Sequence, residues 1–312
     1  MYVLTGDSSQ SPAMTALLAA TKRLSTEEET NQLAQVFRID LSQYSEVVDD
    51  AFVKQVCLYA PNLTEVCLAG LYEITDHVFE YLGRLPGLKQ VDISDTLLVR
   101  PDLQKLTNLE QLRMKGCVTL LTVNLDGLKQ LDAINLSGCS KLTNVHGTGR
   151  GKITTINFSG CGQLTTELEK YHSASTLSLG SCPQVTDNEI YKCIEMTRLE
   201  SLYIHGCLSI TVGGVSYIKR NPSVTRIGLD ANVMAGLDGG KWFKVIIVDG
   251  HECYMDEDGD ARPPSPPSPP CAPNNADPHS HPDSPNHPDA PPYEANSPSY
   301  SPISPGFSPS SP

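Results

Sequence analysis

The chain reads Leu131-Asp-Ala-Ile134-Asn-Leu136-Ser-Gly-Cys139-Ser-Lys-Leu142-Thr143 and then Ile153-Thr-Thr-Ile156-Asn-Phe158-Ser-Gly-Cys161-Gly-Gln-Leu164-Thr165, two near-copies of one phrase. A third copy keeps Leu177, Leu179, Cys182, Val185 and Thr186 in the same order. Each copy supplies one short strand and one turn, and neither can bury its apolar side chains alone. Successive copies must therefore stack into a solenoid with one continuous core.

The same phrase, in weaker form, extends over most of the chain. Its first apolar position recurs at Val36, Leu63, Leu88, Leu109, Leu131, Ile153, Ala174, Leu199 and Val224. These nine units are spaced 27, 25, 21, 22, 22, 21, 25 and 25 residues apart. Because neighbouring strands lie about 4.8 Å apart, nine strands predict a parallel sheet roughly 40 Å long.

The phrase is similar to the cysteine-containing class of leucine-rich repeats, found in F-box receptor subunits of ubiquitin ligases and in a related mitotic-exit antagonist. The likeness covers about residues 36 to 232 and is carried by Leu112-Arg-Met114-Lys-Gly-Cys117, Ile134-Asn-Leu136-Ser-Gly-Cys139, Leu177-Ser-Leu179-Gly-Ser-Cys182 and Leu202-Tyr-Ile204-His-Gly-Cys207. The resemblance implies an α/β leucine-rich repeat solenoid with a concave parallel sheet. It also implies a substrate-recognition component of an SCF-type ubiquitin ligase, although the first 35 residues contain no Leu-Pro F-box motif.

Unit length predicts what covers the convex side. The long units carry extra residues at Asp49 to Tyr59, Asp76 to Leu85 and Asp187 to Met196, where apolar residues recur three or four apart after an acidic start. The short central units lack room for a full helix. We therefore expect helices mainly in the terminal units, and tight turns or extended segments in the middle.

The chain divides into four predicted parts. Residues 1–35 form an N-terminal helical cap, since a solenoid end needs an atypical unit to cover it. The repeat array follows over residues 36–232. Residues 233–256 form a C-terminal cap with one short strand between Trp242 and Val248. Residues 257–312, rich in Pro, Ser and acidic side chains, form a disordered tail.

Charge excludes some classes of partner. The formal net charge is -13, and the part from Asp256 onward carries eight acidic residues against one arginine, which leaves the array only mildly acidic. A basic face for nucleic acid is absent from this pattern, so we predict no nucleic-acid partner. No apolar run reaches the roughly 18 residues that a membrane span needs, and no secretory signal precedes the array. The sequence thus favours a cytoplasmic or nuclear protein without a membrane partner.

No pattern in the sequence points to catalysis or a cofactor. Five cysteines, Cys117, Cys139, Cys161, Cys182 and Cys207, occupy one repeat slot, so their spacing reflects packing rather than disulfides, metal or catalysis. The loop from Gly147 to Lys152 resembles a phosphate loop, but His146 stands where the motif requires glycine. We expect a non-enzyme without cofactor or metal.

The tail contains repeated Ser-Pro pairs. The stretch Tyr300-Ser-Pro-Ile-Ser-Pro-Gly is similar to a heptad of the RNA polymerase II C-terminal repeat. One interpretation is an extended spacer; the other is a segment phosphorylated at Ser301, Ser304 and Ser308, or a docking site for an adaptor or kinase.

The strand positions that face solvent predict where a protein partner binds. They are small and polar in the middle of the array, whereas Arg and aromatic residues, which often dominate interface energies, lie towards the ends. The predicted partner-binding residues on the concave face are Arg113, Lys115, Tyr203, His205 and Arg226.

Overall fold

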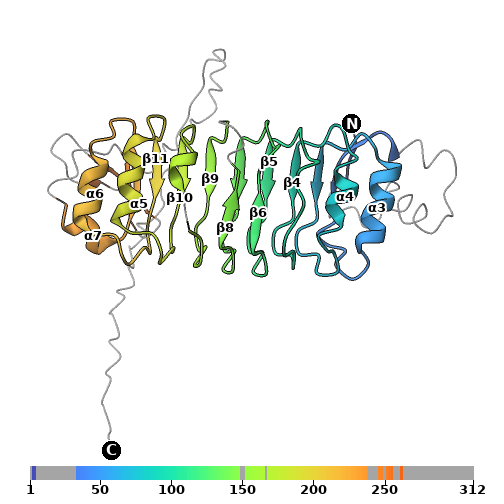
Figure 1. The fold of residues 1–312 in the computed structure, drawn as a ribbon, viewed down its shortest axis with the longest axis horizontal. Helices are drawn as coiled ribbons and strands as arrows, with labels where there is room; N and C mark the ends of the chain where they lie inside the picture. Colours follow the sequence, from blue (N-terminus) through green and yellow to red (C-terminus); the bar gives the residue numbers. More distant parts are fainter. Residues whose placement is uncertain are drawn as a thin grey trace, which may run out of the picture. The chain divides into compact units, whose positions relative to one another are not determined.

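A computed structural model describes residues 2–4, 33–147, 152–165, 167–237, 245–248, 251–255 and 261–262 (Figure 1). Contacts divide the chain into residues 1–265 and 266–312, and every described residue belongs to the first unit. Most of the predicted helical cap, four residues of the Gly147 to Lys152 loop, and the predicted tail from residue 263 onward lie outside the described residues. The same holds for Ser301, Ser304 and Ser308.

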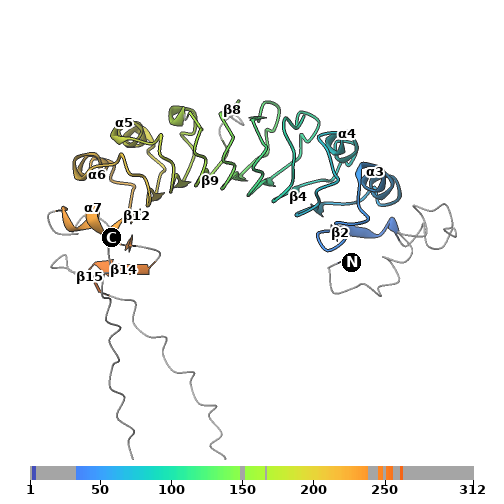
Figure 2. The same ribbon diagram turned by 90° about the horizontal axis from the view of Figure 1, so that it is seen from below.

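Nine repeat strands lie side by side in one parallel sheet, in sequence order (Figure 2). They are β2 (Val36–Asp40), β3 (Glu65–Cys67), β4 (Gln90–Asp92), β5 (Gln111–Arg113), β7 (Ala133–Asn135), β9 (Thr155–Asn157), β10 (Thr176–Ser178), β11 (Ser201–Tyr203) and β12 (Arg226–Leu229). The middle residue of each three-residue strand is buried and opposes its counterpart, as Ile134 opposes Ile156. This arrangement confirms the nine predicted units and their register.

The outer side of the array changes along its length, as unit length predicts (Figure 1). Helices lie towards both ends: α3 (Asp50–Tyr59), α4 (Val78–Leu82), α5 (Asp187–Lys192), α6 (Val212–Ile218) and α7 (Ala231–Ala235), with 3-10 turns η2 (Leu168–Lys170) and η3 (Cys193–Glu195). In the middle, β6 (Thr122–Asn124) and β8 (Asn144–His146) pair as a separate two-stranded parallel sheet. The prediction of helical ends and an extended middle is confirmed.

Aspartates at the start of some helices bind the turn of the next repeat. Thr186 caps α5 in a capping box, and the following Asp187 accepts hydrogen bonds from the backbone nitrogen and hydroxyl of Thr211, at 2.8 and 2.6 Å. Asp76 accepts from the backbone nitrogens of Val99 and Arg100 in the same way. These bonds satisfy backbone donors that would otherwise lack partners at the turn.

The five repeat cysteines form a ladder through the core. All five are buried, and each thiol donates to a backbone carbonyl of the preceding repeat at 3.0 to 3.2 Å: Cys117 to Ile93, Cys139 to Met114, Cys161 to Leu136, Cys182 to Phe158 and Cys207 to Leu179. Each acceptor follows a strand, where the chain turns away from the sheet. The cysteine slot is therefore a packing site that also satisfies a buried carbonyl.

A left-handed turn residue precedes each slot. Its φ lies between 56 and 76° at Gly70, Asp95, Gly116, Gly138, Gly160, Ser181 and Gly206. Glycine suits this conformation because it lacks a Cβ. Asp95 and Ser181 are the non-glycine members, and they carry the backbone strain of that region.

The sheet continues beyond the repeats at both ends, further than the one C-terminal strand that the sequence predicted. Strand β1 (Tyr2–Leu4) pairs in parallel with β2, where we predicted the helical cap. After β12 come β13 (Val245–Val248), β14 (His251–Met255) and β15 (Ala261–Arg262), where we predicted one strand followed by the tail. An Asp-Gly pair, Asp249 and Gly250, joins β13 to β14 in the sequence, and this pair is a strong hairpin signal.

Candidate protein-binding surface

The repeat strands line the inner side of the curved array, and the helices lie on its outer side (Figure 2). Side chains alternate along a strand, so burial of Val66 or Leu112 places the residues before and after it on the opposite face. This inner face is the concave surface, and three parts of it differ in chemistry.

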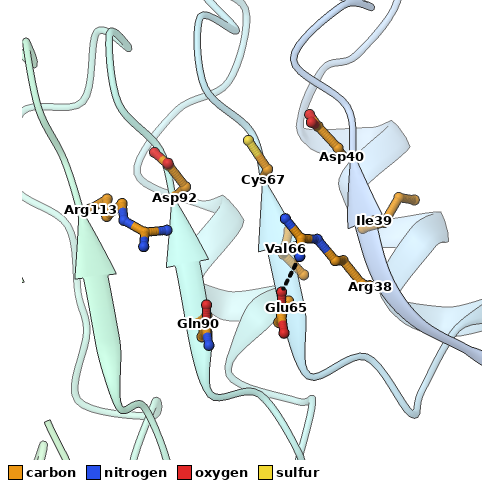
Figure 3. A pocket seen from close by; sticks show the side chains of 9 residues that line it. All are labelled: Arg38, Ile39, Asp40, Glu65, Val66, Cys67, Gln90, Asp92 and Arg113. Atoms are coloured by element: carbon orange, nitrogen blue, oxygen red, sulfur yellow. Dashed lines mark ion pairs between the residues drawn. The ribbon is translucent and has the colours of Figure 1, made fainter. Parts of the chain in front are cut away.

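A charged hollow lies over the first four repeat strands (Figure 3). It has a volume of about 250 Å³ and is lined by Arg38, Ile39, Asp40, Glu65, Val66, Cys67, Gln90, Asp92 and Arg113. Arg38 extends from β2 to Glu65 on β3, with 3.1 Å between their charged atoms, while Arg113 extends from β5 towards Asp92 (Figure 3). We call these residues the charged hollow.

Turn-forming hydrogen bonds hold the two aspartates of the charged hollow in place. One oxygen of Asp40 accepts from the backbone nitrogen and hydroxyl of Ser42, at 3.0 and 2.7 Å. Asp92 does the same with Ser94, at 3.1 and 2.7 Å. Because these bonds fix both side chains, the hollow presents a pre-organised set of charges.

Cys67 is the half-buried thiol of this hollow. Burial, together with the negative charges of Asp40 and Asp92, raises its pKa to about 11. A thiol with this pKa is neutral at physiological pH, and the neutral form is neither a good nucleophile nor a metal ligand. The hollow is consequently suited to binding rather than to thiol catalysis.

In the middle of the concave surface, polar side chains form hydrogen bonds within the turns that follow the strands. Asn135 and Asn157 each accept from the backbone nitrogen two residues ahead, at 3.0 Å, and the hydroxyls of Ser159 and Ser178 lie 3.1 Å apart. Part of their hydrogen-bonding capacity is used locally, to hold the turns after the strands, as it is at Asp40 and Asp92.

Towards the C-terminal end of the concave surface, two side-chain rings pack against glycines. The ring of Tyr203 lies over Gly228, where an added Cβ would come within 2.9 Å of it, and the ring of His205 lies as closely over Gly180. Asp230 accepts from the backbone nitrogen of Gly206 at 2.8 and 2.9 Å. Tyr203 is half-buried and His205 is exposed, so this end presents an aromatic surface of fixed orientation.

The five predicted binding residues fall into two groups rather than one. Arg113 lines the charged hollow, and Lys115 is exposed just beyond it, whereas Tyr203, His205 and Arg226 belong to β11, its following turn and β12. The structure adds Glu65 and Cys67, which our sequence analysis missed. Their position in the second repeat matches that of Gln90 and Asp92 in the third, so strict alignment of all units would have found them.

Nothing in the described ranges points to a metal site or a membrane span. No group of three or more His, Cys, Asp or Glu side chains is placed to hold a metal ion within residues that the structure describes. Among the same residues, no helix is long and apolar enough to cross a membrane.

The geometry is that of a leucine-rich repeat solenoid of the α/β class. No protein-family model matches the chain, and no curated protein sequence matches it. Among solved structures it is similar to internalin C2 of Listeria monocytogenes, with 15% identity, a TM-score of 0.37, and coverage of 76% of this chain and 92% of that one.

Two further solved structures show a similar degree of likeness. Internalin inlF of Listeria monocytogenes has 13% identity, a TM-score of 0.37, and coverage of 77% and 89% of the two chains. A leucine-rich repeat protein of Leptospira interrogans has 12% identity, a TM-score of 0.36, and coverage of 65% and 62%. At these identities the likeness concerns the fold alone.

Proposed function

We propose that the protein is a protein–protein interaction scaffold that recognises its partner on the concave surface. The observation that carries this proposal is the charged hollow, in which Arg38 and Arg113 approach from two sides of a pre-organised pair of aspartates. A hollow with both signs of charge suits a protein segment that carries both acidic and basic groups.

The distance between the two ends favours a macromolecule over a small ligand. Arg113 on β5 and Tyr203 on β11 are four strands apart in the sheet, or about 20 Å at the usual strand spacing. A partner that contacts both must be a folded domain or a segment of several residues. Arginine and tyrosine are also the residue types that tend to dominate binding energy.

We propose a non-enzyme without a cofactor, located in the cytoplasm or nucleus. Burial raises the pKa of every described thiol for which a shift is resolved, including Cys57, to about 12, and Cys207, to about 11, so these thiols are not activated. The eight cysteines of the repeat array, from Cys57 to Cys207, are free, and free buried thiols suit a reducing compartment.

Capture of partners by the tagged full chain tests the proposal. Alanine at Arg113 and Tyr203 together should weaken capture at least about tenfold, or about 1.4 kcal/mol. The matched control is Leu58→Ala on the outer helix α3, where the side chain is exposed. Thermal denaturation separates lost binding from lost packing of Tyr203 on Gly228. Unchanged capture by the double variant, with loss on a change at the outer face, would refute recognition by the concave surface.

A substrate-recognition role in an SCF-type ubiquitin ligase is the second candidate, and the repeat resemblance favours it. Mass spectrometry of the captured proteins distinguishes the two, because ligase core subunits are expected only for the second. The proposed phosphorylation of Ser301, Ser304 and Ser308 by a proline-directed kinase is tested on the same material, by mapping phosphates on the tail.

A further inference from the structure

A row of exposed apolar side chains lies along one edge of the array, outside the concave surface. Tyr72, Leu97 and Val118 each follow two residues after a left-handed turn residue, and they are 59, 47 and 47% exposed. Val47 of the first repeat is 57% exposed. We call these four residues the apolar edge.

Hydrogen bonds and a shared hollow show that members of the apolar edge are neighbours. The turn of Gly70 donates to Ser94, and the turn of Asp95 donates to Lys115, at 2.8 and 2.6 Å, so successive turns stack in register. Val47 and Tyr72 both line one hollow of about 490 Å³. The four side chains therefore form one continuous row across four repeats.

The fold does not require this row. The adjacent core positions Leu71, Leu98 and Cys117 are fully buried, and they complete the packing beneath the edge. The next three repeats carry Ser140, Gly162 and Pro183 at the same position, the repeat after them carries Leu208, and all of them stack in the same sheet. Single exposed apolar residues are ordinary, but a row of four indicates a binding surface.

Acidic side chains accompany the apolar edge. Glu46, Glu73 and Asp95 are exposed, and within the described part of the chain no hydrogen bond or ion pair engages their carboxylates. Glu46 and Glu73 line the hollow that Val47 and Tyr72 share. Lys115 is the basic residue in register beside Asp95, so the surroundings keep a negative balance. The complementary partner carries positive charge next to apolar side chains.

The spacing of the side chains along the apolar edge is close to the rise of one α-helical turn. Repeats are about 4.8 Å apart, while one turn of an α-helix rises 5.4 Å, so a helix lying along the edge places one side chain per turn opposite each repeat. Three repeat steps correspond to about 14 Å, or roughly ten helical residues. We propose that the apolar edge docks an amphipathic helix of a partner protein, with apolar residues three or four apart and Lys or Arg beside them.

A synthetic amphipathic helix of leucine, alanine and lysine, labelled with a fluorophore, is the probe for this proposal. Fluorescence polarisation with the full chain should show binding, and circular dichroism should show a gain in peptide helicity. Tyr72→Ser combined with Leu97→Ser should weaken binding at least tenfold, whereas Leu208→Ser, at a single side chain 90% exposed, should leave it unchanged. Glu46→Gln with Glu73→Gln should weaken binding and reduce its dependence on salt.

Several results would overturn the proposal. Equal binding by wild type and the Tyr72→Ser, Leu97→Ser variant would place the peptide elsewhere. Equal binding of a peptide with glutamate in place of lysine would refute the charge argument, and binding without a gain in helicity would refute a helical partner. Sedimentation of the full chain is the remaining measurement. A dimer that dissociates in the same variant would make a second copy, not a helix, the occupant.

Discussion

The first four repeats and the three that begin at Leu131, Ile153 and Ala174 share one framework but differ in what they expose. In the central three, the neutral Asn135 and Asn157 make the turn hydrogen bond that Asp40 and Asp92 make in the first four, and the edge position is small or proline. In the first four, charged side chains line a hollow, and the edge position is apolar. Since both sets stack in the same sheet, the difference is not needed for folding. We propose that this difference reflects a role of the N-terminal repeats in recognition.

The largest expected difference between these regions is in the loss of stability when a cysteine is replaced by arginine. Cys139 is buried in a central repeat, so Cys139→Arg would bury an unpaired charge and should lower the free energy of unfolding by about 3 to 5 kcal/mol. Cys67→Arg enters the charged hollow beside Asp40 and Asp92 and should cost less than about 1 kcal/mol. Thermal or urea denaturation measures both, and similar losses in the two variants would contradict the assignment of these positions.

Alkaline pH should destabilise the array next most strongly. Burial raises the pKa of Cys161 and Cys193 from the ordinary value of 9.0 to about 12. Unfolded thiols therefore lose protons first as pH rises, so their stabilising contribution is complete below pH 9.0 and is lost progressively towards pH 12. Each such thiol should lower the free energy of unfolding by about 1 kcal/mol per pH unit in that window.

Melting temperature as a function of pH checks this expectation. Cys161→Ala removes one of the titrating groups from a central repeat and should make the fall in Tm shallower. A Tm that stays constant from about pH 8 to about pH 11 would mean that the thiols ionise as easily in the folded chain as in the unfolded one.

Two positions on the concave surface should differ in effect: substitution of one should lower stability, and substitution of the other should weaken binding. Asn157→Ala removes the acceptor of a turn hydrogen bond and should cost about 1 kcal/mol of stability, with partner capture unchanged. Arg113→Ala loses only a hydrogen bond to Gln111 on its own strand and should change stability by less than about 0.5 kcal/mol while it weakens capture. The comparison fails if Asn157→Ala reduces capture as strongly as Arg113→Ala, once both are corrected for the folded fraction.

The smallest effect concerns the left-handed turns. Ser181 has a φ of 56°, so Ser181→Gly should relieve strain and stabilise the array by about 0.5 kcal/mol. Ser137→Gly, at a position without positive φ, is the matched control and should destabilise by about 0.5 kcal/mol or more. Urea denaturation measures whether each variant raises or lowers the free energy of unfolding. Stabilisation by both variants would mean that the positive φ of Ser181 is not the cause.

Local periodicity predicts the repeat strands but not the ends of the sheet. In each unit the residues three and five positions after the first apolar residue are buried, and this pattern fixes the strand register. An acidic residue followed by apolar residues three or four apart locates α3 and α5. Strand β1 and the hairpin partner β14 carry no repeat phrase. They are ordered by pairing with a neighbouring strand, which no single-segment pattern contains.

The concave site was predictable by position but not by environment. Alignment predicted that Arg113 and Tyr203 lie on the concave face, which is where the structure has them. It could not reveal that Asn157 is engaged by its own turn, that Tyr203 rests on Gly228, or that Arg38 pairs with Glu65. These contacts join different repeats or depend on turn geometry. The exposed row of Val47, Tyr72, Leu97 and Val118 also becomes visible only when the turns are stacked.

Site-specific photo-cross-linking tests directly whether the partner binds the concave surface. A benzophenone amino acid is placed at Arg113 in the charged hollow in one sample and at Leu58 on the outer helix α3 in another, and each full chain is irradiated with its captured partner. We expect a cross-link to the partner from position 113 and none from position 58. Cross-linking from position 58 alone would contradict recognition by the concave surface.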